Sequence, residues 1–377
     1  MKYETKATLR QYAAAIIANV AAFCIGNMLG WSSPVQPILE SENSPIGEPL
    51  TRPQFSWLSS INFLGGVAGT LFWGRLSDKL GRKWTGLLVA VPFAVGWALI
   101  LAANNQWILY IGRVFIGIGC SGTVINTPVF VTEIAQDKIR GALGSLLMIN
   151  LNLGTLFSFI VGASTSYYFL TATCLGVVLL YFLGLLFMPD SPGSLLVKKK
   201  RAEALKSMCW YRGGDQVQAE KDLTLVETRL TKPRRSYASI FESKGRTKGF
   251  IIGVGFIIGQ QACGMLAVTT YAVTIFKEAV AYSIGAGPVP FIVLSELFAP
   301  DIRGTAISLI QFIGIGLSFV TVKIFPWMNS QLGPTITFGS FGLASLLLPI
   351  FIIFVVARNE RSNTQFHRAR VGRRKAR

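Results

Sequence analysis

The sequence predicts an all-α protein that crosses a membrane about ten times. Of its 377 residues, 51% are apolar and only 14% are charged, and the mean hydropathy is +0.49. A soluble domain of this composition would have too little polar surface to cover its core. The apolar residues also form runs of about 20 residues, the length that a helix needs to cross the hydrocarbon layer of a bilayer.

Ten apolar runs are long enough to be membrane spans, and only the connection after the sixth is long. The runs lie at 13–37, 55–76, 84–104, 107–134, 141–164, 167–188, 249–276, 279–298, 304–325 and 334–357. The first run has no small-residue cleavage pattern behind it, so we interpret it as a retained span rather than a signal peptide.

The polar stretch after the sixth run divides the protein into unequal parts. Residues 198–208 and 219–230 have the pattern of short amphipathic helices, and Gly213 and Gly214 separate them. We therefore expect four regions. They are a six-helix bundle over 1–188, a cytosolic helical linker over 189–248, an incomplete bundle of four helices over 249–357 and a basic cytosolic tail over 358–377.

The net charge of +18 is distributed unevenly along the chain. Residues 193–248 contain 14 Lys and Arg against 6 Asp and Glu, and the tail 358–377 contains 8 against 1. The segment 40–52, by contrast, contains three Glu and one Arg. This is the positive-inside asymmetry of membrane proteins, so we expect the basic segments and both termini in the cytosol. The basic stretches lack interleaved aromatic residues and zinc-ligand spacing, so no nucleic-acid partner is expected.

A repeated motif indicates that the two bundles are related by duplication. The text EIAQDKIRGALGSL begins at Glu133, and ELFAPDIRGTAISL begins at Glu296. Many transporters are built from such repeats, with the substrate site between them. The first copy joins the fourth and fifth predicted spans, whereas the second joins the second and third spans of its own bundle. One pair of spans is therefore expected to be missing between about 276 and 282.

The loop GRLSDKLGRK, between the second and third spans, is the most specific motif. Two helices that enter one short turn need glycines for close approach, and the Asp can accept hydrogen bonds from backbone amides or from a neighbouring Arg. We expect a cytosolic charge network that closes an inner gate. Its candidate residues, with one further membrane charge in the fourth span, are Gly74, Arg75, Asp78, Gly81, Arg82, Arg113, Glu133, Arg140, Glu296 and Arg303. The alternatives are a basic loop that only fixes topology and, for Arg113, a side chain that reaches the membrane interface.

Further motifs follow in a fixed order along the chain. They are GWSSP at Gly30, GRVFIGIG at Gly112, PVFVTEIAQDKIRGALGS at Pro128, PDSP at Pro189, QQACG at Gln260 and GPVPF at Gly287. In this combination the chain resembles the sugar-porter family of the major facilitator superfamily, and GWSSP is most similar to the insect trehalose transporters and related glucose transporters. The resemblance implies two six-helix bundles, of which this chain lacks the family's eighth and ninth spans and the outer part of the tenth.

The resemblance also implies a sugar site between the bundles, where amides and hydroxyls partner the sugar and an aromatic ring covers its C–H face. The implied substrate-binding residues are Gln260, Gln261, Tyr271 and Phe291. The family pattern is not complete. Met148 replaces a Gln, Leu266 and Gly314 each replace an Asn, and Phe291 replaces a Trp. For the two glutamines the alternative is hydrogen bonding between helices, and for Phe291 it is packing.

Metal and enzyme chemistry are not expected. The only histidine is His367, in the tail, and the five cysteines are scattered singly. This pattern shows no metal-ligand spacing. No nucleophile–base set or phosphate loop is present, and no cofactor is expected.

We therefore expect facilitated passage of a hexose or trehalose through the plasma membrane by alternating access. The family's symporters carry an Asp near Ser32, and the first span has no carboxylate, which favours uniport over proton coupling. Two alternatives stay open: a proton-coupled symporter, and a shortened chain that acts only as an interaction partner. Expected partners are the sugar, membrane lipid, and a second copy or a full-length relative. Because the missing pair would remove one wall of the cleft, we expect transport by this chain alone to be weak or absent.

Overall fold

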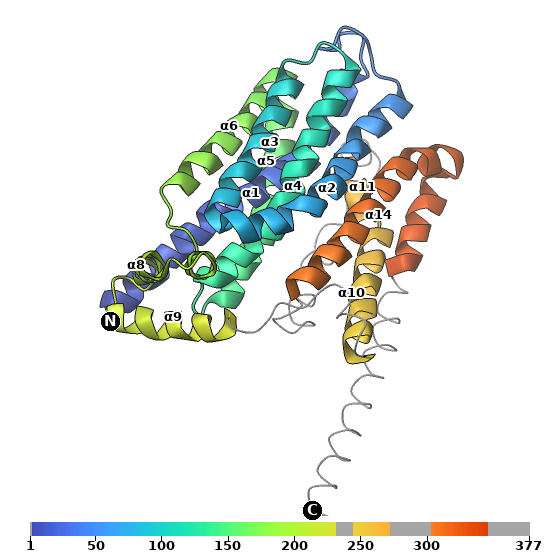
Figure 1. The fold of residues 1–377 in the computed structure, drawn as a ribbon. Helices are drawn as coiled ribbons and strands as arrows, with labels where there is room; N and C mark the ends of the chain where they lie inside the picture. Colours follow the sequence, from blue (N-terminus) through green and yellow to red (C-terminus); the bar gives the residue numbers. More distant parts are fainter. Residues whose placement is uncertain (1, 231–243, 272–302, 346–377) are drawn as a thin grey trace, which may run out of the picture.

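The computed structural model describes residues 2–230, 244–271 and 303–345, and they form helices joined by short connections, with no strand among them (Figure 1). The predicted all-α class is confirmed. Seven helices of the described residues are long and apolar enough to cross a membrane. The predicted count of ten includes residues outside this part, where the span at 279–298 lies.

Six of these helices form the first bundle. They are α1 (Lys2–Leu39), α2 (Arg52–Leu80), α3 (Arg82–Leu101), α4 (Gln106–Ile134), α5 (Arg140–Ser164) and α6 (Tyr167–Leu186). Polar caps fix several of the ends. Thr51 forms a capping box with Gln54 before α2, and the Asn105 and Ser166 side chains accept backbone N–H groups at the starts of α4 and α6.

Close packing holds the first bundle together, with α1 against α5, α2 against α4, and α3 against α4 and α6. Glycines permit the closest approaches. A Cβ at Gly117 of α4 would lie 1.8 Å from the backbone oxygen of Asn62, and a Cβ at Gly154 of α5 would lie 2.2 Å from that of Phe23. Small residues at such crossings let membrane helices pack backbone to backbone.

Three short helices cover one end of the first bundle, which we call the linker end. They are α7 (Pro192–Val197), α8 (Arg201–Tyr211) and α9 (Gln216–Leu230). The two amphipathic helices predicted here are present as α8 and α9. Gly213 and Gly214 turn the chain between them with φ of 73° and 104°, which glycine adopts without strain.

The first turns of α1 extend past the bundle and hold α8 in place. Arg10 Nη1 donates to the Trp210 carbonyl at 3.0 Å, and Gln11 Nε2 donates to the Tyr211 carbonyl at 3.0 Å. Gln11 Oε1 also accepts the Gln136 backbone N–H at 2.8 Å, in the connection between α4 and α5. Two hydrogen bonds therefore hold α8 against α1, and a third joins α1 to the connection between α4 and α5.

The second bundle, as far as it is described, consists of α10 (Lys244–Ala262), α11 (Met265–Thr270), α14 (Arg303–Gln331) and a helix over 333–345. The predicted span over 249–276 is interrupted within its described residues. The helix breaks at Cys263-Gly264, where Gly264 has φ +70°. A left-handed glycine ends α10, and α11 continues after it.

The two bundles meet along α2 and α14, while α11 lies against α1 (Figure 1). Lys323 of α14 places its Nζ 4.2 Å from the centre of the Trp57 ring, and its backbone carbonyl accepts the Ser56 hydroxyl at 3.1 Å. Deeper in the membrane, Gly66 leaves room for Ile315. Residues 56 and 57 lie near the end of α2 that is distant from α7–α9, which we call the opposite end.

Candidate functional site

The centre of the predicted charge network is Arg82, in the first turn of α3 at the linker end. Its side chain is mostly buried. Nε pairs with Glu133 Oε1 of α4 at 3.1 Å, and Nη1 pairs with Asp78 Oδ1 of α2 at 3.1 Å and with the Ser77 hydroxyl at 2.7 Å. One guanidinium thus joins three helices through charge-assisted hydrogen bonds.

Further polar groups that the sequence analysis did not select complete this network. Asn126 Nδ2 donates to the Arg82 carbonyl at 2.9 Å, and its Oδ1 accepts the Ser77 hydroxyl at 2.8 Å. Ser191 donates its hydroxyl to Glu133, and Asp190 Oδ1 accepts the Lys83 backbone N–H at 3.0 Å. Asp190 and Ser191 belong to the PDSP motif, so the sequence analysis could have identified them from this motif.

The other predicted network residues lie in different surroundings. Arg75 is exposed and forms no ion pair with the described residues, and Gly74 has open space around it. Gly81 makes the turn between α2 and α3 with φ +86°. Arg140 pairs with Asp137 at 2.6 Å instead of joining Glu133. Arg303 begins α14, and Glu296 and Phe291 lie outside the described residues.

Arg113 is buried in the first bundle and does not extend to the membrane interface. Its exposed fraction is 1%. Nε donates to the Leu58 carbonyl at 3.2 Å, Nη1 to the Met28 carbonyl at 3.1 Å and Nη2 to the Ser32 hydroxyl at 2.5 Å. Its guanidinium also lies 5.3 Å from the Trp31 ring centre. This arginine therefore joins α1, α2 and α4 without a carboxylate partner.

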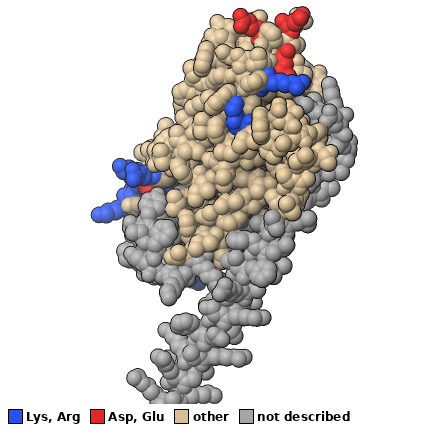
Figure 2. All heavy atoms as spheres, turned by 90° about the vertical axis from the view of Figure 1, so that its right-hand side faces the viewer, with Lys and Arg blue, Asp and Glu red and all other residues tan. Residues whose placement is uncertain are grey.

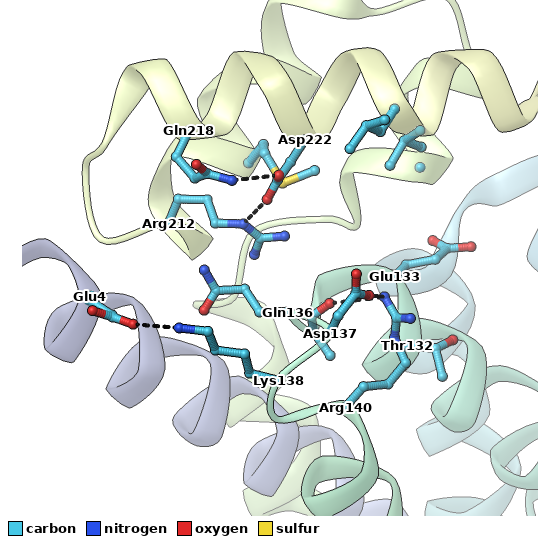
Figure 3. Close-up of a pocket in the computed structure, with 15 residues that line it drawn as sticks. Glu4, Thr132, Glu133, Gln136, Asp137, Lys138, Arg140, Arg212, Gln218 and Asp222 are labelled. Carbon is cyan, nitrogen blue, oxygen red and sulfur yellow. Dashed lines mark hydrogen bonds and ion pairs between the residues drawn. The ribbon is translucent and has the colours of Figure 1, made fainter.

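A cavity of about 370 Å³ lies at the linker end, between the start of α1, the connection from α4 to α5, and α7–α9 (Figure 3). Its charged groups pair with one another: Lys138 with Glu4 at 3.2 Å, and Arg212 with Asp222 at 2.5 Å. Nearby, burial and, to a lesser degree, Asp190 raise the pKa of Tyr211, whose neutral hydroxyl donates to the Pro189 carbonyl. No aromatic residue is among the described residues that line this cavity, and we interpret it as a gap between the linker helices and the first bundle rather than as a sugar site.

The predicted sugar-binding glutamines lie in the last turn of α10, just before the break at Gly264. Both side chains are half-buried, and neither amide makes a hydrogen bond to a described residue. Two positions that depart from the family pattern are filled by packing: Leu266 contacts the apolar core, and a Cβ at Gly314 would lie 2.6 Å from Ile257. Among the described residues, Gln260 and Gln261 therefore have no hydrogen-bond partner.

Tyr271 follows α11 and lies where the bundles meet. Its ring stacks on Phe325 of α14 at 5.3 Å and touches the edge of Phe55 of α2 at 6.2 Å. Its hydroxyl is buried close to the hydroxyls of Ser56 and Ser59 of α2. Asn62 of α2 is also buried, and its Nδ2 contacts the Met28 sulfur at 3.3 Å. No motif marks Ser59 or Asn62, so the sequence analysis did not select them.

Two packed bundles of apolar helices define the class of a polytopic membrane protein. A family model described as "Sugar (and other) transporter" matches residues 14–280 and 279–368. The chain therefore belongs to this family. The two matched pieces meet at 279–280, inside the stretch 276–282 where the repeat analysis placed the missing pair of spans.

Relatives and solved structures agree with this assignment. The chain is 35% identical over 272 residues to the bovine "Solute carrier family 2, facilitated glucose transporter member 8", covering 72% of this chain and 55% of that protein. It is 25% identical over 448 residues to the "Facilitated trehalose transporter Tret1" of Polypedilum vanderplanki, covering 96% of this chain and 88% of that protein. The chain thus spans about half the length of the glucose-transporter relatives that it matches.

The fold is that of the xylose transporter XylE from E. coli in a partially occluded inward open conformation. The TM-score is 0.71 at 16% identity, and the match covers 91% of this chain and 98% of that one. At this identity the likeness shows the fold alone.

Proposed function

We propose that the protein carries a sugar, either a hexose or trehalose, across a membrane by facilitated alternating access. The observation that carries this proposal is the pair of free amides of Gln260 and Gln261 beside the break at Gly264. A broken membrane helix with uncommitted polar side chains, lying between two repeats, is the usual form of a substrate site in transporters. The names of the glucose- and trehalose-transporting relatives support the same substrate class.

Uniport without proton coupling is supported by the surroundings of Arg113. Its neighbour on α1 is the Ser32 hydroxyl at 2.5 Å, which stays neutral at any physiological pH. Within the described membrane helices, the only carboxylates are those near the helix ends, such as Asp78 and Glu133. A proton carrier at membrane depth needs an ionisable group whose charge changes, and these helices supply none at their centres.

We further propose that the Arg82 network stabilises the linker end while the bundles move. Arg82 holds α2, α3 and α4 together, and Glu133 connects them to Ser191 before α7. A rigid first bundle is what a rocking motion requires, since the motion then occurs at the contact with the second bundle. Arg75, Arg140, Glu296 and Arg303 stay candidates for contacts made in another conformation.

For orientation, we propose that both termini and the linker face the cytosol of the plasma membrane. On the face in Figure 2, acidic side chains lie mainly at the opposite end, with a few basic side chains just below them, and most of the described surface further down carries no charge. Leu225 of α9 is 58% exposed, so a Leu225→Cys variant reports the side of the membrane. We expect an impermeant maleimide to label this cysteine only after the cells are permeabilised. Labelling in intact cells would place the linker outside the cell.

Transport is tested with the purified chain in proteoliposomes, by uptake of radiolabelled D-glucose and trehalose. The expected result is saturable but weak uptake, because the missing pair of spans removes one wall of the cleft. Gln261→Leu should remove this uptake and Gln216→Leu should leave it unchanged, because Gln216 is an exposed residue of α9. The two-piece family match favours one alternative, a chain that binds sugar but does not move it. Binding without uptake would support that alternative, and absence of both would reject the proposal.

A further inference from the structure

Gln311 of α14 is a buried polar side chain that forms no hydrogen bond with a described residue. Its exposed fraction is 7%. Ser318, a buried polar residue on the same side of α14, differs from it, because the Ser318 hydroxyl donates to the Gly314 carbonyl at 2.9 Å. A buried amide without a hydrogen bond destabilises the folded protein, so the amide of Gln311 needs a reason.

The amide of Gln311 lies beside Gly314, three residues further along α14. Its Oε1 is 3.7 Å from the place that a Cβ at Gly314 would occupy. The same Cβ would lie only 2.6 Å from Ile257 Cγ2 of α10, so position 314 leaves no room for a side chain of its own. At this crossing of α10 and α14, the amide therefore comes from the preceding turn of α14.

The crossing adjoins the two glutamines of α10. Ile257 precedes Gln260 and Gln261 by three and four residues, so these three side chains lie on one side of the helix. The amide of Gln311 therefore lies beside the turn of α10 that leads into the glutamine pair. Neither Gln260 nor Gln261 forms a hydrogen bond to a described residue, so adjoining turns of α10 and α14 carry three uncommitted amides.

The crossing also faces the first bundle. Ile315 packs against Gly66 of α2, where a Cβ would lie 3.1 Å from Ile315 Cγ2. Gln311 precedes Ile315 by four residues, so the two share one side of α14. The amide of Gln311 therefore comes from the side of α14 that lies toward α2. This is the side on which the bundles separate during alternating access, and a ligand then reaches the amide.

We propose that Gln311 binds a hydroxyl group of the sugar from α14 and is a specificity-determining residue of this chain, although no motif marks it. This inference rests on the proposed function. The ligand class follows from the group: a primary amide donates through its nitrogen and accepts through its oxygen, as a sugar hydroxyl also does. The side chains described beside it, Ile257, Ile315 and Ser318, carry no charge, which argues against an ionic ligand.

The test is sugar binding by the purified full chain in detergent, measured as the rise in melting temperature with increasing D-glucose or trehalose. Gln311→Leu replaces the uncommitted amide by an apolar side chain of similar size, so the melting temperature without sugar should stay equal or rise. The apparent affinity for sugar should fall about tenfold, the loss of roughly one hydrogen bond. Ser318→Ala is the matched control, because the Ser318 hydroxyl is already paired within α14.

A panel of monodeoxy analogues of D-glucose separates a direct contact from a structural effect. The analogue that lacks the hydroxyl bound by Gln311 should bind the wild type and Gln311→Leu with equal affinity. The other analogues should bind the wild type more tightly, because they keep that hydroxyl. A structural effect of the substitution would weaken the binding of all analogues alike.

The outcomes keep this inference apart from the proposed function. If the wild type shows no sugar-dependent shift, the proposed function itself fails. If the wild type responds and Gln311→Leu responds equally, Gln311 does not contact the sugar, and only this inference is rejected. A melting temperature that falls without sugar, or an equal weakening of all analogues, would show a structural role and also reject it. A loss of affinity in Gln311→Leu but not in Ser318→Ala, with one analogue unaffected, supports it.

Discussion

The two bundles differ in how particular polar side chains are held and in the surroundings of two glycines, Gly117 and Gly316. In the first bundle, Arg82 and Arg113 each join three helices through several hydrogen bonds, and Gly117 brings two backbones together. In the described part of the second bundle, Gln260 and Gln261 are free, and a Cβ at Gly316 would have no neighbouring atom within 4 Å. In the first bundle these charged side chains join helices to one another, whereas Gln260 and Gln261 join no described helices.

The largest loss of stability is expected from Gly117→Ala in the first bundle, and Gly316→Ala in the second bundle is its comparison. Gly117→Ala would place a Cβ 1.8 Å from the Asn62 backbone oxygen, so α2 and α4 must separate. We expect a loss of more than about 4 kcal/mol and no monodisperse protein on size-exclusion chromatography. Gly316→Ala has open space and should be neutral or stabilising by up to about 1 kcal/mol. Equal behaviour of the two variants would contradict the comparison.

Arg113→Met is expected to have the next largest effect. It removes three hydrogen bonds from a fully buried guanidinium and leaves the Ser32 hydroxyl without its donor. A loss of about 3 kcal/mol in the free energy of unfolding is expected, measured by thermal or denaturant unfolding in detergent. Arg113→Lys should recover only part of it, because one ammonium cannot reach all three acceptors. Full recovery by Lys would mean that charge alone matters there.

A smaller effect is expected from Arg82→Gln, since Glu133 and Asp78 keep partial access to water. We expect about 1–2 kcal/mol less stability and a transport rate that falls more than the affinity for sugar, because the balance between conformations changes. Arg75→Gln is the matched control at the same turn, and it should stay within about 0.5 kcal/mol. If Arg82→Gln transports at the wild-type rate, the network does not affect the conformational balance and only fixes the topology of the loop.

The smallest effect is expected where the bundles meet. Lys323→Met removes the cation from the Trp57 ring but keeps the backbone carbonyl that Ser56 binds. The expected loss is about 0.5–1 kcal/mol. Because the contact lies at the opposite end, its loss should increase maleimide labelling of a cysteine placed at buried Ser59 of α2. Unchanged labelling would show that α2 and α14 are held together by their other contacts.

Helix number and position in the first bundle could be predicted from hydropathy because a backbone in lipid must satisfy its own hydrogen bonds. The ends were less predictable, since caps such as Thr51 and Asn105 act through local side chains. The break at Gly264 was missed because an apolar run does not show where one residue turns to positive φ.

The site was only partly predictable for a related reason. Arg82, Asp78 and Glu133 could be found because a motif with repeated charges marks them. The hydrogen bond of Ser191 to Glu133 joins residues 58 positions apart, and no local pattern reports it. The inward position of Arg113 likewise depends on carbonyls of two other helices. Tertiary contacts of this kind become visible only when the helices are packed.

The hydrogen bonds between α1 and α8 have a consequence for the order in which the chain folds during synthesis. The hydrogen bonds of Arg10 and Gln11 to Trp210 and Tyr211 join residues 200 positions apart. Once these residues leave the ribosome, every helix of the first bundle has its partners, while the rest of the chain needs on the order of 10 seconds more. The first bundle can thus reach its final form early and serve as the template on which α14 and α11 later assemble.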